Sequence, residues 1–228
     1  MNTRVKTSLI CLILSVDKSP WREIQTLGQN ETFSNSSESG ILYLRYMGHD
    51  SPIPPLGLVA LALKKFQHWL YLSFLNRTGF RWIAKFAYWD ALDSIIRRSA
   101  SWVQTETHII RGTSASESNF PDTILTQSIE HSTLIGLKTI QAFQYLVDNF
   151  DFEYVFRTNS SSYVDGPLLL ELTRGLKAGD TYGGIFADAP KGPFASGAGI
   201  LISRSLIEKL LKEIASWRHG LIDDVALS

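Results

Sequence analysis

Five small polar residues, Thr158–Ser162, directly follow a stretch rich in aromatic and β-branched residues, Phe152–Arg157. The stretch predicts a strand and the polar residues predict the loop beyond its carboxyl end, which is where open α/β sheets bind their ligands. Small hydroxyl and amide groups, with free backbone N–H groups, suit the close approach of a phosphate or a ribose. The guanidinium of Arg157 suits bidentate binding of a diphosphate. The competing interpretation is an ordinary polar turn, with Arg157 in a surface ion pair.

Two adjacent acids, Asp223 and Asp224, follow an amphipathic helical pattern near the end of the chain. Repulsion between neighbouring carboxylates makes one of them a better proton acceptor, as a general base requires. An acidic pair that caps the start of a terminal helix is the competing interpretation.

The segment Phe194–Gly199 consists mainly of small residues, among them Ser196 and Gly197. Such residues let a backbone or a ligand approach closely. The segment is not a dinucleotide-binding fingerprint, because no third glycine stands at Ile202 and no helix is predicted to begin there. We therefore expect Ser196 and Gly197 to line a cleft.

The chain has 228 residues, with 22 Lys and Arg against 22 Asp and Glu, 44% hydrophobic residues and one cysteine. This length and this composition predict one globular domain with a sizeable core. The zero formal charge argues against a nucleic-acid partner and against a polybasic membrane anchor. Cys11 is the lone cysteine, so the chain forms no internal disulfide, and no Cys/His spacing predicts a zinc site.

Strands are predicted to alternate with helices, which implies an α/β fold with a mainly parallel central sheet flanked by helices. The predicted strands are Leu9–Leu14, Ile41–Met47, Phe152–Arg157, Thr181–Phe186 and Gly199–Ser203. The predicted helices are Trp21–Leu27, Leu56–Leu75, a stripe of apolar residues within Ser128–Val147, Leu168–Leu176 and Ser205–Trp217. Two polar segments, Gly28–Gly40 and Gly112–Asp122, predict loops.

Two apolar segments bear on membrane contact. Arg4 and Lys6 precede Leu9–Leu14 as in a short signal peptide, but the run is too short to span a bilayer and no cleavage site of small residues follows. A buried first strand explains the run better. The aromatic residues of Leu56–Leu75 suit core packing, a partner surface or peripheral contact with a membrane.

Four motifs, taken in order, resemble the β-1,3-galactosyltransferase and Fringe group of glycosyltransferases. In that group a Leu-Lys-Thr stretch opens a helix, and a strand ending in Lys-x-Asp-Asp-Asp, a Ser-Gly-x-Gly strand and a Glu/Asp-Asp-Val motif follow. The matching segments here are Leu137–Thr139, Phe156–Val164, Ser196–Gly199 and Ile222–Val225, within about residues 120–228. The resemblance implies a single GT-A-like domain over residues 1–228, with a nucleotide-sugar-binding half (1–160) and an acceptor or catalytic half (161–228).

This resemblance implies an inverting transfer of a sugar from a nucleoside-diphosphate sugar, foremost a UDP-sugar, to a hydroxyl of a glycan or another acceptor. Asp224 matches the family's final Asp and is the candidate catalytic base, oriented by Asp223. The residues expected to hold the donor follow the first strand, end the strand before the polar loop, or lie in that loop: Ser15, Asp17, Arg157, Asn159, Ser160 and Ser161. The acceptor cleft is expected at Ser196, Gly197 and Asp223.

The chain departs from the family at the metal site, because Asn159-Ser160-Ser161 stands in place of Asp-Asp-Asp. Uncharged oxygens are weak ligands for Mn²⁺ or Mg²⁺, so no cofactor is firmly implied. Three interpretations stay open: Arg157, with Lys138 or Lys191, supplies the positive charge; Asp165 restores a metal site; or the site is inactive. The chain ends four residues after Asp224, where family members continue, so a truncated acceptor side is a further interpretation.

Two other functions compete with transfer. One is a non-catalytic module that binds a nucleotide-sugar or a glycan and has lost the metal site. The other is a different nucleotide-dependent activity, such as methyl transfer, but no glycine-rich turn follows Leu9–Leu14 to support it.

Four glycosylation sequons, at Asn30, Asn35, Asn76 and Asn159, would matter only in a secretory lumen. A long signal anchor and paired cysteines, which a Golgi enzyme usually has, are not found in the sequence. We therefore expect a cytoplasmic protein, with the secretory lumen as the alternative.

Overall fold

The fold is described from a computed structural model of the chain. The structure describes residues 4–16, 19–24, 40–49, 62, 65, 66, 69, 122–130, 134–177, 179–189, 192–214 and 227. The predicted helix over 56–75 and the predicted loops over 28–40 and 112–122 lie almost entirely outside these residues.

A six-stranded sheet forms the centre of the described structure, with the strand order β4-β3-β2-β6-β8-β7. Strands β2, β3, β4 and β6 are mutually parallel, whereas β8 runs antiparallel to both β6 and β7. The bounds are Leu9–Leu14 for β2, Ile41–His49 for β3, Asp122–Ile129 for β4, Tyr154–Asn159 for β6, Tyr182–Ala189 for β7 and Gly192–Ser203 for β8. Two short strands, β1 (Val5–Lys6) and β5 (Phe150–Asp151), pair separately.

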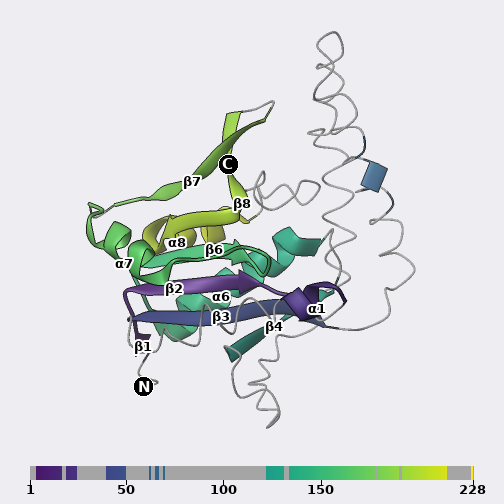
Figure 1. The fold of residues 1–228 in the computed structure, drawn as a ribbon, viewed down its shortest axis with the longest axis horizontal. Helices are drawn as coiled ribbons and strands as arrows, with labels where there is room; N and C mark the ends of the chain where they lie inside the picture. Colours follow the sequence, from purple (N-terminus) through teal and green to yellow (C-terminus); the bar gives the residue numbers. More distant parts are fainter. Residues whose placement is uncertain are drawn as a thin grey trace.

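Helices cover both faces of this sheet. Among the described helices, α6 (Ile135–Asn149) packs on one face together with α8 (Arg204–Lys212), and α7 (Gly166–Arg174) packs on the other. A one-turn helix, α1 (Trp21–Ile24), follows β2 (Figure 1). The chain therefore has the expected α/β fold, with a mostly parallel sheet flanked by helices.

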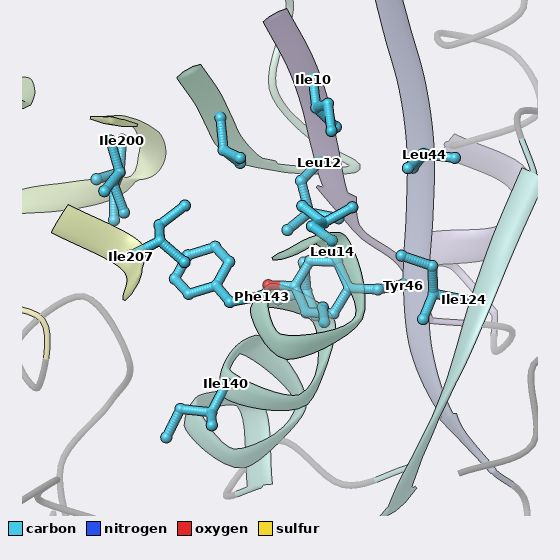
Figure 2. Close-up of a cluster of buried hydrophobic side chains, with 14 of the residues drawn as sticks. Ile10, Leu12, Leu14, Leu44, Tyr46, Ile124, Ile140, Phe143, Ile200 and Ile207 are labelled. Carbon is cyan, nitrogen blue, oxygen red and sulfur yellow. The ribbon is translucent and has the colours of Figure 1, made fainter. Parts of the chain in front are cut away.

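Strand β2 contributes to two hydrophobic clusters, one on each face of the sheet. Its six residues are all buried, and their side chains alternate between the two faces. Ile10, Leu12 and Leu14 face α6 and α8, and the other three residues face α7. Figure 2 shows the larger cluster, in which Phe143 of α6 and Ile207 of α8 meet the strand residues. An apolar run buried on both faces is the pattern expected of a central parallel strand, so the prediction of a buried first strand is confirmed.

Several predicted boundaries are wrong, each for a local reason. The strand predicted over 152–157 lies at Tyr154–Asn159, because Thr158 and Asn159 continue the pairing with β2. The strand predicted over 199–203 begins at Gly192, since Gly192–Ala195 also pair with β7. Helix α6 begins only at Ile135, because the residues before it include β4, which was not predicted.

The described residues of α8 end at Lys212, short of the predicted Trp217. Among the described residues, no helix is both long and apolar enough to cross a bilayer.

Candidate functional site

The strand order reverses at β2, where β3 and β4 lie on one side and β6 on the other. In open α/β sheets, ligands bind in the crevice beyond the carboxyl ends of the two strands that flank such a reversal. Ser15 follows β2 at this point, and Asn159 ends β6. The N–H of Ser160 donates to the carbonyl of Leu14 at 3.1 Å, which places Ser160 beside Ser15. The structure thus brings together Ser15, Asn159 and Ser160.

The hydroxyl of Ser15 is fully buried and has no hydrogen-bond partner among the described residues. Other buried hydroxyls nearby do have partners: that of Ser128 bonds to Gln141 Oε1 at 2.9 Å, and that of Thr126 donates to the Met47 carbonyl at 3.0 Å. A buried polar group without a partner costs free energy. The Ser15 hydroxyl is therefore a hydrogen-bonding group that no described residue satisfies, at the point where the strand order reverses.

The other members of the polar loop differ in exposure. Ser160 is buried, Asn159 is half-buried and Ser161 is exposed. A short turn shapes the loop, because the N–H of Ser162 donates to the carbonyl of Asn159 at 3.1 Å. The loop consequently presents hydroxyl and amide groups at different depths along one edge of the sheet.

Arg157 lies inside the protein with only 1% of its surface exposed, so the surface ion pair considered from the sequence is wrong. Its Nε donates to the hydroxyl of Tyr46 at 3.1 Å, and its Nη1 donates to the carbonyl of Gly197 at 2.7 Å. Two guanidinium donors are thus used within the protein. Direct contact of Arg157 with a diphosphate stays a prediction.

Lys138 is also buried, on the second turn of α6. Its Nζ lies 2.6 Å from Oε1 of Glu130, and Oε2 of Glu130 accepts the Gly48 N–H at 2.6 Å. The Lys138 ammonium is therefore held in an internal ion pair that ties α6 to the ends of β3 and β4. Glu130 and Tyr46 had not been singled out from the sequence. No local sequence pattern pointed to either residue, because their partners, Lys138 and Arg157, lie 8 and 111 residues away in the chain.

Two of the residues predicted to line the acceptor cleft, Ser196 and Gly197, lie on β8, which is antiparallel to β6. Ser196 is half-buried, Gly197 is buried and Ala198 is exposed. The Thr158 hydroxyl donates to the Ala198 carbonyl at 2.7 Å. The structure therefore connects the loop end of β6 directly to the predicted cleft segment.

The side chains of the polar loop, Thr158–Ser162, are not suitable ligands for a hard divalent cation. Amide and hydroxyl oxygens carry no charge to balance Mn²⁺ or Mg²⁺. Asp165, which the sequence offered as a replacement ligand, instead caps α7 by accepting the N–H of Leu168 at 3.0 Å. Within the described residues, no group of three or more His, Cys, Asp or Glu side chains is arranged to bind a metal.

Two other features lie away from the polar loop. Burial raises the pKa of the Cys11 thiol and keeps it protonated, so it is no nucleophile. A hollow of about 660 Å³ lies at the opposite edge of the sheet, next to Lys6, Ser8, Asp151 and Glu153. The charged side chains that line it are all exposed to solvent, so they do not form a buried polar site.

Four residues named from the sequence, Asp17, Lys191, Asp223 and Asp224, lie outside the described residues. No protein-family model matches the chain, and no curated protein is significantly similar to it.

Proposed function

We propose that the chain is a glycosyltransferase with a GT-A-like fold, which moves a sugar from a nucleoside-diphosphate sugar to an acceptor hydroxyl. The observation that carries the proposal is the buried Ser15 hydroxyl, which lacks a described partner at the point where the strand order reverses. Asn159 and Ser160 lie next to it, and hydroxyl and amide groups at such an edge suit a ribose or a phosphate. The order of the four motifs that resemble the β-1,3-galactosyltransferase and Fringe group supports sugar transfer as the reaction.

In this proposal the acceptor hydroxyl oxygen attacks the anomeric carbon while the bond from that carbon to the diphosphate oxygen breaks. Asp224 takes the proton from the acceptor, and the nucleoside diphosphate leaves with the electron pair of the broken bond. Ser15, Asn159, Ser160 and Ser161 hold the donor through hydroxyl, amide and backbone N–H groups. These dipoles stabilise the charge that develops on the leaving group.

A non-catalytic module that binds a nucleotide-sugar is the second candidate, and the uncharged composition of Asn159-Ser160-Ser161 favours it. The two candidates share the donor site. They differ in turnover, since the module would bind the donor without breaking it.

We expect cleavage of a UDP-sugar to persist in EDTA, with the rate changing by less than about twofold. The reason is that no step in this proposal uses a divalent cation bound by the polar loop. The measurement is release of UDP with and without an acceptor mixture, across several UDP-sugars. Cleavage abolished by EDTA would show that a metal is held elsewhere. Binding of UDP-sugar without any release of UDP would favour the non-catalytic module.

Ser15→Ala should leave the thermal midpoint unchanged or raise it slightly, because the substitution removes a buried hydroxyl that has no described partner. The same change should weaken UDP-sugar binding by about tenfold, the usual loss for one hydrogen bond to a ligand. Calorimetry of unfolding and of donor binding measures the two effects.

The matched control is Ser128→Ala, which removes a buried hydroxyl that does have a partner, Gln141. This variant should lower the thermal midpoint and leave donor binding intact. If Ser15→Ala behaves like Ser128→Ala, the hydroxyl of Ser15 has an internal role and the donor site is placed wrongly.

A further inference from the structure

Strands β6 and β8 separate at the edge of the sheet where the polar loop lies. Their antiparallel pairing runs from Tyr154 opposite Ser203 to Arg157 opposite Ile200, and it stops there although both strands continue. On its other side β8 pairs with β7 at Ile200–Ile202 and again at Gly192–Ala195, with an irregularity between Gly184 and Phe186 of β7. Figure 1 shows β7 and the start of β8 rising away from the other strands.

Two side chains of β6 bridge the separation in place of the missing ladder bonds. Nη1 of Arg157 donates to the Gly197 carbonyl, and the Thr158 hydroxyl donates to the Ala198 carbonyl, each at 2.7 Å. Successive residues of a strand point to opposite faces of the sheet. Arg157 and Thr158 consequently hold consecutive carbonyls of β8 from its two sides, and we call this pair of contacts the β8 clamp.

The clamp is anchored in α6 through a chain of hydrogen bonds. The hydroxyl of Thr139 donates to the Ile135 carbonyl at 3.0 Å, and its oxygen lies 2.9 Å from that of Tyr46. Each hydroxyl has a single proton, so Tyr46 donates to Thr139 and accepts from Nε of Arg157. All the bonds then run in one direction, from the guanidinium to the first turn of α6.

Burial makes this arrangement rigid. Arg157, Tyr46 and Thr139 are at most 1% exposed, and hydrogen bonds that are buried away from water hold such side chains in one geometry. Ala198, by contrast, is exposed and Ser196 is half-buried. The clamp thus connects an immobile interior to an accessible segment of small residues.

We infer that Arg157 and Thr158 are positioning residues, which set the place of Ser196–Ala198 and thereby the fit of the acceptor in the cleft. The acceptor part of this inference rests on the proposed function, whereas the clamp itself does not. Arg157 acts through the backbone of β8 in this assignment, and it need not touch the donor. Ser196 and Gly197 then contact the acceptor through positions that the clamp determines.

The test combines hydrogen exchange with kinetics on Thr158→Val, which keeps the shape of the side chain and removes the hydroxyl. We expect amide exchange in a peptide covering residues 192–200 to accelerate about tenfold, while exchange in β2 stays unchanged. The KM for the acceptor should rise about fivefold to tenfold, while the affinity for the UDP-sugar changes less than about twofold. Thr158→Ser retains the hydroxyl and should restore both values.

The matched control is Thr173→Val on α7, where the lost hydroxyl had donated to the Leu170 carbonyl at 2.9 Å. It should affect neither residues 192–200 nor the acceptor KM. If Thr158→Val does not fold, Tyr46→Phe tests the same clamp by removing the acceptor of Arg157 Nε.

Unchanged exchange at 192–200, or acceleration spread evenly over the chain, overturns the clamp. Faster local exchange with an unchanged acceptor KM keeps the clamp and overturns its role in acceptor fit. Absence of any sugar transfer by the unaltered protein overturns the proposed function and the acceptor role together, and the exchange result still decides the clamp.

Discussion

Lys138→Met is expected to lower the free energy of unfolding by about 3–5 kcal/mol, the usual cost of removing one partner from a buried ion pair. The substitution leaves the carboxylate of Glu130, whose side chain is only 8% exposed, without the ammonium that now lies 2.6 Å away. An uncompensated buried charge is far more costly than the pair itself is stabilising. Urea unfolding measures the loss as a lower midpoint with an unchanged slope.

A double variant separates the ion pair from the packing around it. Lys138→Met combined with Glu130→Gln removes both charges, and the new amide oxygen is still able to accept the Gly48 N–H. We expect this double variant to recover most of the stability lost by Lys138→Met. A double variant that is as unstable as the single one would show that packing, and not charge, determines the loss.

Lys209→Met is the matched control, because Lys209 pairs with Asp180 on the surface. The hydrogen bond from Lys209 holds the pKa of Asp180 below its usual value. Both side chains are well exposed, however, and such pairs contribute little to stability. Removing this lysine should therefore barely move the unfolding midpoint. A loss comparable to that of Lys138→Met would contradict the argument from burial.

Much of the fold could be predicted because apolar pattern and burial agree in the centre of the sheet. Leu9–Leu14 is a continuous apolar run and is buried on both faces, as predicted. Strand β4 escaped prediction because its inward residues, Ile124, Thr126 and Ser128, are mostly hydroxyl-bearing. Their burial depends on hydrogen bonds to Met47 and Gln141, which a pattern of hydrophobicity does not reveal.

The interior positions of Arg157 and Lys138 could not be predicted for a related reason. Charged side chains are almost always exposed unless a partner is buried with them, and the partners here come from other elements. The hydroxyl of Tyr46, which accepts from Arg157, is 111 residues away in the chain. From the sequence, both residues were expected to offer positive charge to a phosphate, whereas the fold pairs the Lys138 ammonium with Glu130 and uses two donors of the Arg157 guanidinium internally.

The placement of the polar loop at a candidate ligand site, by contrast, could be predicted from a topological rule, whereas Ser15 was named from the family resemblance. The ends of neighbouring parallel strands meet at one edge of a sheet, so a polar loop after one strand lies near the residue after the next. This rule brings Ser15 and Ser160 together. The rule says nothing about Asp224, whose proposed role rests only on the resemblance of the motif order to the glycosyltransferase group.

Asp224→Asn should therefore give the most decisive activity measurement. We expect sugar transfer to fall by roughly 10²–10⁴-fold, the contribution of a positioned general base, because the amide is not able to take the acceptor proton. Donor affinity should change less than about twofold, since the substitution keeps the size of the side chain and the base acts on the acceptor.

The dependence of kcat/KM on pH distinguishes loss of a base from distortion of the site. The unaltered enzyme should lose activity at low pH as the base is protonated, and the residual activity of Asp224→Asn should lack this decline. Asp165→Asn is the matched control, because Asn is as good a cap for α7 as Asp and the transfer rate should be retained. Transfer by Asp224→Asn at the unaltered rate would exclude Asp224 as the base.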